Sequence, residues 1–143
     1  LGMASLQAVR QIVKSMKHTP IFEKCLQHIH VVSAGDGKIK CTMPVMEEHL
    51  NMNKTMHGGL TATLVDSVSS WAFATTKEAK FGVSIDINVT YLTAAKQGET
   101  ITITSEVLKQ GRTIGFANVD IHNEAGNLVA TGRHTKFMAS AAY

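Results

Sequence analysis

The chain has 143 residues, of which 44% are hydrophobic and 17% are charged, and its formal net charge is +3. This length fits one domain spanning 1–143, and the combination of apolar content and low charge excludes a disordered chain. The scattered Lys and Arg residues exclude the dense cationic surface of a nucleic-acid-binding protein, and no apolar run reaches the ~18 residues of a membrane-spanning helix.

The first predicted element is an amphipathic helix over 4–17, because apolar residues recur at helical spacing from Leu6 to Met16. No acidic residue precedes Glu23, so a mitochondrial targeting element is one interpretation. The scarcity of Ser and Arg favours the other, a helix that packs on the domain. We expect Met3 to be the native start and the protein to be intracellular, in the cytoplasm, the mitochondrion or both.

A β-hairpin is predicted next. Residues 27–34 are rich in Ile and Val, 35–37 form a turn signal, and 38–45 alternate strictly between apolar and polar residues. His28 and His30 would share one face of the first strand, but two ligands without a third are too few to indicate a metal site. Residues 46–57 show no clean periodicity, which indicates a loop.

A long, buried helix is predicted over 58–76. Leu60, Leu64, Val68 and Trp71 follow helical spacing, and this is the most apolar helical stretch in the chain. We therefore expect this helix to be the central one.

Four strands are predicted after the long helix, over 82–92, 100–108, 113–123 and 128–138. The alternation changes phase near Phe116 and Ala117, which predicts a β-bulge there. Short turns between consecutive strands imply antiparallel pairing. The order of elements favours an α+β fold of the hotdog type, with an antiparallel sheet of about six strands around one helix.

Two features of the long helix suggest a site. Asp66 is a lone carboxylate in the most apolar helix, and Gly58 and Gly59 lie at its start. The N–H groups at a helix N-terminus could stabilise an oxyanion, and glycine lets a carbonyl carbon come close. The alternatives are an Asp66 that is hydrogen-bonded across an interface and a glycine pair that forms only a tight turn.

The spacing of these groups argues for two subunits. Gly58 and Asp66 are about 12 Å apart along a helix axis, so one helix cannot bring both to the same carbonyl. Two antiparallel helices related by a two-fold axis would bring Asp66 of one subunit to Gly58 of the other. The hypothesis is a dimer with two composite sites.

Several motifs carry a resemblance to a known family. Asn51, the run HGGLTATLVD at 57–66, GVSIDINVTY at 82–91 and GRHTK at 132–136 resemble the hotdog-fold acyl-CoA thioesterases, over nearly the whole chain. The resemblance implies hydrolysis of a fatty acyl-CoA of medium to long chain to free fatty acid and CoA. It also implies a dimer of dimers. We expect no metal, and no cofactor apart from the CoA that is part of the substrate.

The resemblance assigns roles to five residues. Gly58, helped by Asn51, would hold the thioester carbonyl, and Asp66 of the opposite subunit would activate a water or attack directly. Ser84, which by alternation lies on the polar face of its strand, would position that water. His57 would support the loop.

A basic mouth is expected for the anionic CoA, with Lys96, Lys109, Arg112 and Lys136 at strand ends or turns. By the family resemblance, the substrate-binding residues would be Glu47, Ser84, Asp86, Tyr91, Leu92, Thr93, Ala94, Ala95, Lys96, Lys109, Gln110, Gly111, Arg112, Thr113, Ile114, Lys136 and Phe137.

Two other functions fit the same fold. An enoyl-CoA hydratase would need an acid and a base at one carbon pair, whereas His57 and Asp66 are about 13 Å apart along the helix. A non-catalytic acyl-CoA-binding protein would have no need of a lone carboxylate at position 66. Acyl-chain preference and the choice between general-base and covalent catalysis stay open at this stage.

Overall fold

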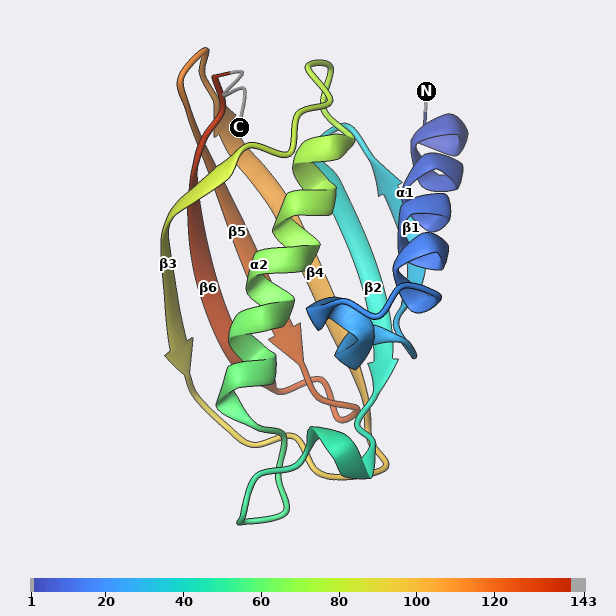
Figure 1. Ribbon diagram of the computed structural model, residues 1–143. Helices are drawn as coiled ribbons and strands as arrows, with labels where there is room; N and C mark the ends of the chain where they lie inside the picture. Colours follow the sequence, from blue (N-terminus) through green and yellow to red (C-terminus); the bar gives the residue numbers. More distant parts are fainter. Residues whose placement is uncertain (1, 140–143) are drawn as a thin grey trace.

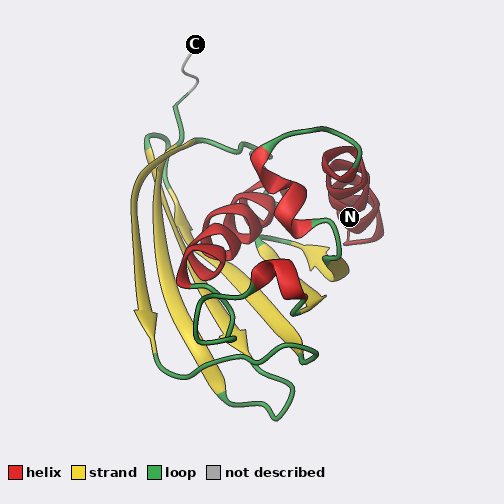
Figure 2. Ribbon diagram, turned by 60° about the horizontal axis from the view of Figure 1, so that its bottom comes forward, coloured by secondary structure: helices red, strands yellow, loops and turns green. Residues whose placement is uncertain are grey.

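The computed structural model describes residues 2–139 and consists of one curved sheet with its helices on one side (Figures 1 and 2). In chain order, the elements are α1 (Gly2–Lys17), the 3₁₀ helix η1 (Phe22–Leu26), β1 (His30–Gly35), β2 (Lys38–Pro44), the 3₁₀ helix η2 (Glu47–His49), α2 (Gly58–Ala74), β3 (Val83–Tyr91), β4 (Thr100–Gln110), β5 (Ile114–His122) and β6 (Leu128–Phe137).

The six strands form one antiparallel sheet in the order β1-β2-β4-β5-β6-β3. The sheet curves around α2, which crosses its concave face (Figure 1). The predicted α+β architecture is therefore confirmed. The first and third strands of the chain form the two edges, so β3 has a neighbour on one side only.

Helix α2 is buried because two glycines let it approach the sheet. A Cβ on Gly132 of β6 would lie 2.7 Å from Val65 Cγ2, and a Cβ on Gly115 of β5 would lie 2.7 Å from Phe73 Cε1. Real Cβ atoms do not come so close to carbon. Both positions therefore exclude any larger side chain unless α2 moves away.

Helix α1 packs beside β1, with Val9 and Val13 buried in the main core. The Arg10 guanidinium donates two hydrogen bonds to the Val31 carbonyl, from Nε at 3.1 Å and from Nη2 at 2.9 Å. The helix that packs on the domain is thus the observed arrangement. None of the helices in 2–139 combines the length and apolar character needed to cross a bilayer.

Most predicted element boundaries agree with the structure to within two residues, but β1 begins at His30 rather than at residue 27. Residues 27–29 instead form the turn that follows η1, whose buried Leu26 anchors it to the core. His28 therefore precedes the strand and does not share a strand face with His30. The predicted loop 46–57 contains the short helix η2.

The bulge expected near Phe116 and Ala117 lies in the neighbouring strand. Val107 pairs with Ala117 and Lys109 pairs with Phe116, so Leu108 of β4 is the extra residue. The phase of β5 is unbroken at this point: Gly115 and Ala117 face the core, whereas Phe116 is exposed. The sequence signal was misleading because Phe73 of α2 packs against this end of β5, where the inner face carries the small residues Gly115 and Ala117.

Candidate active site

Asp66 lies halfway along α2, and its side chain keeps 51% of its surface exposed. It lines a cavity of about 410 Å³ together with Ser70 and Trp71 of α2, Ser84 of β3 and Lys136 of β6. Ile12 and Met16 of α1 close another side of this cavity. The lone carboxylate is therefore open to a ligand and not consumed by a contact within the described residues.

Ser84 reaches this cavity because β3 contains a bulge. Ser84 pairs with Lys136 and Asp86 pairs with Thr135, which leaves Ile85 as the extra residue. Cross-strand partners share a face, so Ser84 lies on the inner face with Ile87. The expectation that Ser84 lies opposite the apolar residues of this strand is therefore wrong, because the alternation was read through the bulge.

A buried histidine connects Ser84 to α2. Within β6, His134 is fully buried, and its Nε2 lies 2.8 Å from Ser84 Oγ while its Nδ1 lies 2.6 Å from Ser69 Oγ. Burial lowers the pKa of His134 to about 4, and the Lys136 cation adds to this effect while Asp86 opposes it. The ring is therefore neutral at pH 7. Its 4.0 Å approach to Asp66 Oδ1 is not an ion pair.

This arrangement does not activate Ser84 as a nucleophile. Serine hydrolases use a histidine that accepts the serine proton and a carboxylate that stabilises the resulting imidazolium. Here a serine hydroxyl occupies the place of that carboxylate, and the low pKa of His134 makes it a weak base at neutral pH. Asp66 is the stronger candidate for the base.

Lys136 is buried, which corrects its predicted place at a basic mouth. Its side chain is on the inner face of β6, it is 3% exposed, and its Nζ donates to Ser70 Oγ at 2.5 Å. Burial lowers the pKa of Lys136, and the Asp66 carboxylate opposes that shift. Lys136 is thus a cation beside Asp66 in the cavity rather than a solvated charge at a turn.

The N-terminus of α2 forms a second group of site residues. His57 is the N-cap, and its Nδ1 accepts a hydrogen bond from Gly59 N–H at 2.8 Å. Tyr91, at the end of β3, donates its hydroxyl to the Gly58 carbonyl at 2.9 Å. The hydrogen bonds of the described residues include none from Gly58 N–H, so this donor stays available to a ligand oxygen.

The Asn51 side chain stabilises the loop that precedes α2 through hydrogen bonds. Its Oδ1 accepts from Asn53 N–H and Thr55 N–H, and its Nδ2 donates to Thr55 Oγ1 at 3.0 Å. The side chain thereby closes the turn before His57. Its proposed contact with a thioester carbonyl would use the second Nδ2 proton.

An apolar hollow of about 310 Å³ adjoins the start of α2. Phe22, Cys25, Leu60 and Thr63 contribute to its lining, with His49 and His57 at its polar side. Phe22 is exposed although it is a large apolar residue. The hollow could hold an apolar chain next to Gly58.

The residues proposed to bind CoA fall into two groups at opposite ends of the protomer. Tyr91, Leu92, Thr93, Ala94, Ala95 and Lys96 follow the end of β3 beside Gly58. Ser84, Lys109, Gln110, Gly111, Arg112, Thr113, Ile114, Lys136 and Phe137 gather at the start of β3 and the turn between β4 and β5. Ser84 and Tyr91 are seven residue steps apart along β3, about 23 Å at the rise of a strand.

The predicted residues Ala95, Glu47 and Asp86 have individual surroundings. Ala95 is buried and its carbonyl accepts from Met56 N–H, so it anchors the loop. Glu47 is exposed in η2, and Asp86 lies on the outer face of β3 opposite Thr135. Gln110, Gly111 and Arg112 line a separate hollow of about 320 Å³ with Lys80.

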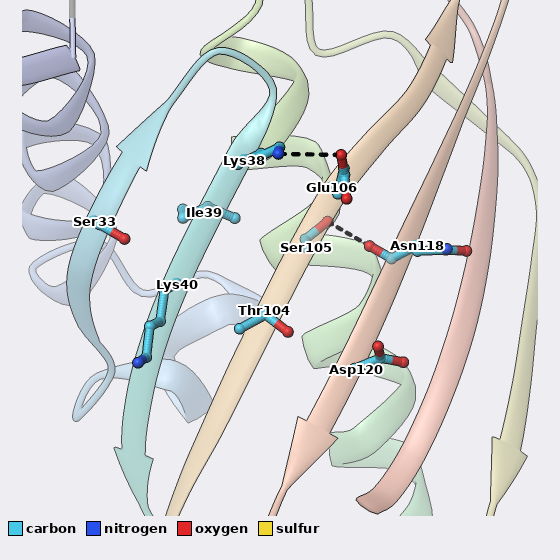
Figure 3. Close-up of a pocket in the computed structure, with 9 residues that line it drawn as sticks. All are labelled: Ser33, Lys38, Ile39, Lys40, Thr104, Ser105, Glu106, Asn118 and Asp120. Carbon is cyan, nitrogen blue, oxygen red and sulfur yellow. Dashed lines mark hydrogen bonds and ion pairs between the residues drawn. The ribbon is translucent and has the colours of Figure 1, made fainter.

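The outer face of the sheet also has a hollow, of about 310 Å³ (Figure 3). Its polar lining comes from β1, β2, β4 and β5, with an ion pair of 3.4 Å between Lys38 and Glu106. Helix α2 passes behind these strands in Figure 3. None of the predicted site residues lines this hollow, so it is not the candidate site.

No group of three metal-ligating side chains occurs within 2–139. His28 instead faces Glu48 at 3.8 Å near the surface.

His134 was not among the site residues expected from the sequence. The available signal was its position within GRHTK, since alternation places His134 and Lys136 on the same face as Ala130 and Gly132. Polar groups at inward positions of a strand indicate a site or a buried network.

Comparison with known proteins identifies the family of this chain. The family model described as "Thioesterase superfamily" matches residues 53–130, which contain Gly58, Asp66 and Ser84. The chain is a member of the thioesterase superfamily. The resemblance drawn from the sequence motifs is thereby confirmed.

Individual thioesterases extend the match to almost the whole chain. Acyl-coenzyme A thioesterase 13 from Homo sapiens is 50% identical over 135 residues, covering 94% of this chain and 96% of the relative. The crystal structure of zebra fish thioesterase superfamily member 2 is 50% identical with a TM-score of 0.91, covering 94% and 98%. This chain is therefore a homologue of acyl-CoA thioesterases with the hotdog fold.

A solved structure with a ligand is more distant. A hypothetical thioesterase protein from Streptococcus pneumoniae TIGR4, solved with coenzyme A, is 30% identical with a TM-score of 0.75, covering 80% of this chain and 88% of that one. Coenzyme A binding is thus known within this superfamily on the same fold.

Proposed function

We propose that this thioesterase hydrolyses fatty acyl-CoA of medium to long chain to free fatty acid and CoA. The observation that carries the proposal is the half-exposed Asp66, a lone carboxylate of the buried helix that faces a cavity beside Ser84. The 50% identity to acyl-coenzyme A thioesterase 13 supports the substrate class. The apolar hollow beside Gly58 supports a long acyl chain.

The chemistry follows from the charges that develop during the reaction. Attack by water on the thioester carbonyl creates an oxyanion, which the free Gly58 N–H at the positive end of α2 would stabilise. Asp66 accepts a proton from the water as general base, and Ser84 orients that water. The tetrahedral intermediate then collapses and expels the CoA thiolate, whose protonation completes the reaction.

The site requires a second subunit, because Gly58 and Asp66 are about 12 Å apart along α2. The edge strand β3 supplies the surface for it: Val83, Ile85 and Tyr91 are 40%, 55% and 56% exposed on a strand with one free edge. A long apolar edge is a template for pairing with another strand. We place the partner's β3 antiparallel against it, related by a two-fold axis.

This pairing would also unite the two groups of CoA-binding residues. Antiparallel β3 strands bring Tyr91 of one subunit toward Ser84 of the other, and with them Gly58 toward Asp66. The segments 91–96 and 109–114 would then line one channel from two chains. A dimer of dimers would follow from a second contact between such pairs.

The test is Asp66→Asn, measured as release of free thiol from a series of acyl-CoA substrates. The variant should lose about 10²- to 10⁴-fold in kcat with little change in KM, because the lost group acts in the transition state. Glu23→Gln is a matched control, since Glu23 is a second carboxylate lining the same cavity and has no proposed role. The control should turn over like the parent.

The proposal is contradicted if Asp66→Asn keeps near-normal turnover, or if both variants lose activity to the same extent. A hydratase would be shown instead by enoyl-CoA hydration without thiol release, and a binding protein by tight acyl-CoA binding with no turnover in the parent.

A further inference from the structure

The network around His134 fixes the direction of its hydrogen bonds. Ser69 Oγ lies 2.6 Å from the Val65 carbonyl oxygen, one helical turn earlier, and 3.0 Å from the Asp66 carbonyl oxygen. Carbonyl oxygens only accept, so the single Ser69 hydroxyl proton must point to them. A Ser69 lone pair therefore faces His134 Nδ1, 2.6 Å away.

This assignment determines the tautomer of His134. Because Ser69 Oγ accepts, Nδ1 must carry the ring proton and donate it. A neutral imidazole has one proton only, which leaves Nε2 as an acceptor. Ser84 Oγ, 2.8 Å from Nε2, therefore donates its own proton to the ring.

We infer that His134 is a positioning residue, which holds the Ser84 proton so that Ser84 presents only lone pairs to the attacking water. The inference rests on the proposed function, because it concerns the water that Asp66 activates. A water between Asp66 and Ser84 would donate one proton to each of them. Its own lone pair would then be directed at the carbonyl carbon.

The surroundings of His134 hold its ring, and with it the Ser84 hydroxyl, in one orientation. The ring is fully buried between β6 and α2, and its Ser69 partner belongs to the same helix as Asp66. The bond from Ser69 to the Val65 carbonyl ties the orientation of Ser84 to the backbone of α2. The helix thus controls both groups that face the water.

The first test is the tautomer itself, read from the two ring nitrogens of His134 by long-range ¹H–¹⁵N correlation at pH 7 in the otherwise unchanged protein. The signal is assigned by its absence in His134→Gln. Protonated Nδ1 with unprotonated Nε2 is expected. The opposite tautomer, or a doubly protonated ring, overturns the inference whatever the activity of the enzyme.

The second test uses two substitutions that each keep one half of the ring's function. Gln at 134 can place an oxygen near the Nε2 position and accept from Ser84, whereas Asn can place only an N–H near the Nδ1 position. His134→Asn should lower kcat by about 10- to 100-fold with KM nearly unchanged, as Ser84→Ala should. His134→Gln should keep most of the activity.

The double variant separates positioning from a structural role. If His134 acts through Ser84, adding His134→Asn to Ser84→Ala should cost less than about two-fold more in kcat. Independent, multiplying losses overturn the inference, as does a His134→Gln variant as slow as His134→Asn. Wild-type turnover by Ser84→Ala overturns it too, while leaving Asp66 as the proposed base.

A failure of the proposed function can be told apart from a failure of the positioning role of His134. If Asp66→Asn keeps its turnover, the base is wrong, yet the Nδ1-protonated tautomer and the coupling between Ser84 and His134 would still be measurable. If Asp66→Asn is inactive and the tautomer is reversed, only the positioning role of His134 is wrong.

Discussion

Gly132 shows how much one residue contributes to the placement of the site, because it lets α2 lie close to β6. Gly132→Ala would put a Cβ 2.7 Å from Val65 Cγ2 and 2.8 Å from Val65 Cγ1. Val65 is buried and its branched side chain cannot turn away. The variant should lose about 1–3 kcal/mol of unfolding free energy, measured by urea denaturation at fixed protein concentration.

Val65→Ala provides the control for that clash. The Gly132→Ala/Val65→Ala pair should be more stable than the sum of the two single losses predicts, because the new Cβ fills the space left by Val65. Additive losses would mean that the contact with Val65 is not the cause.

Another single residue, His134, should make the unfolding free energy depend on pH. Its pKa is about 4 in the folded protein against an ordinary value of 6.5, so the unfolded chain binds more protons between these values. The contribution of His134 to stability is therefore complete above pH 6.5 and lost as the pH falls toward 4. From pH 7.5 to pH 5 the loss should be about 2 kcal/mol.

The measurement compares the parent with His134→Gln, in which every other histidine titrates unchanged. The unfolding free energy of the parent should fall more steeply over this range than that of the variant. Parallel pH dependences would show that His134 is not held neutral by burial.

At the scale of elements, α1 protects the free edge of β1. The carbonyl of Val31, on this edge strand, accepts two hydrogen bonds from Arg10, and Val9 and Val13 anchor the helix in the core. Arg10→Met should lower the unfolding free energy by about 1 kcal/mol, because Arg10 is solvent-exposed and the bonds are partly screened.

Lys14→Met is the matched control for the charge, since Lys14 is exposed on the same helix. It should leave the unfolding free energy nearly unchanged. Equal losses in the two variants would mean that general charge on α1 matters and the contact with Val31 does not.

At the scale of the whole molecule, the composite site predicts that two inactive proteins can restore each other. Asp66→Asn removes the base, and Gly58→Val blocks the carbonyl site. In a mixed dimer one site carries both lesions and the other carries neither. Refolding the two together should recover up to about a quarter of parental activity, because half of randomly paired dimers are mixed and each has one intact site.

Subunit exchange must be shown independently, for example by pulling down a tagged partner. If mixed dimers form and no activity returns, the site is not shared between subunits. A Cβ at Gly58 would lie 3.3 Å from the Tyr91 ring, and this contact could unfold the start of α2. The circular dichroism spectrum of each single variant is therefore compared first with that of the unsubstituted protein. Asn51→Ala serves as the second lesion if Gly58→Val does not fold.

The sequence by itself determined what periodicity and local chemistry specify. Alternation and turn residues are local, and they placed all six strands and the central helix, with most boundaries within two residues. The lone Asp66 and the glycines at the helix start could be identified for the same reason, because a charge in an apolar helix stands out without knowledge of its neighbours. The motif GRHTK marked β6, and the alternation that puts His134 on the same face as Ala130 and Gly132 was a local signal for it.

The tertiary structure alone decided which side chains meet. The bulge at Ile85 turned Ser84 inward, and the packing of Phe73 over Gly115 hid the true phase of β5. Lys136 became a buried cation and His134 a link from Ser84 to α2, because strands distant in sequence from that helix face it across the core. Such contacts depend on register and on the closeness of helix to sheet, quantities that no local pattern of residues encodes.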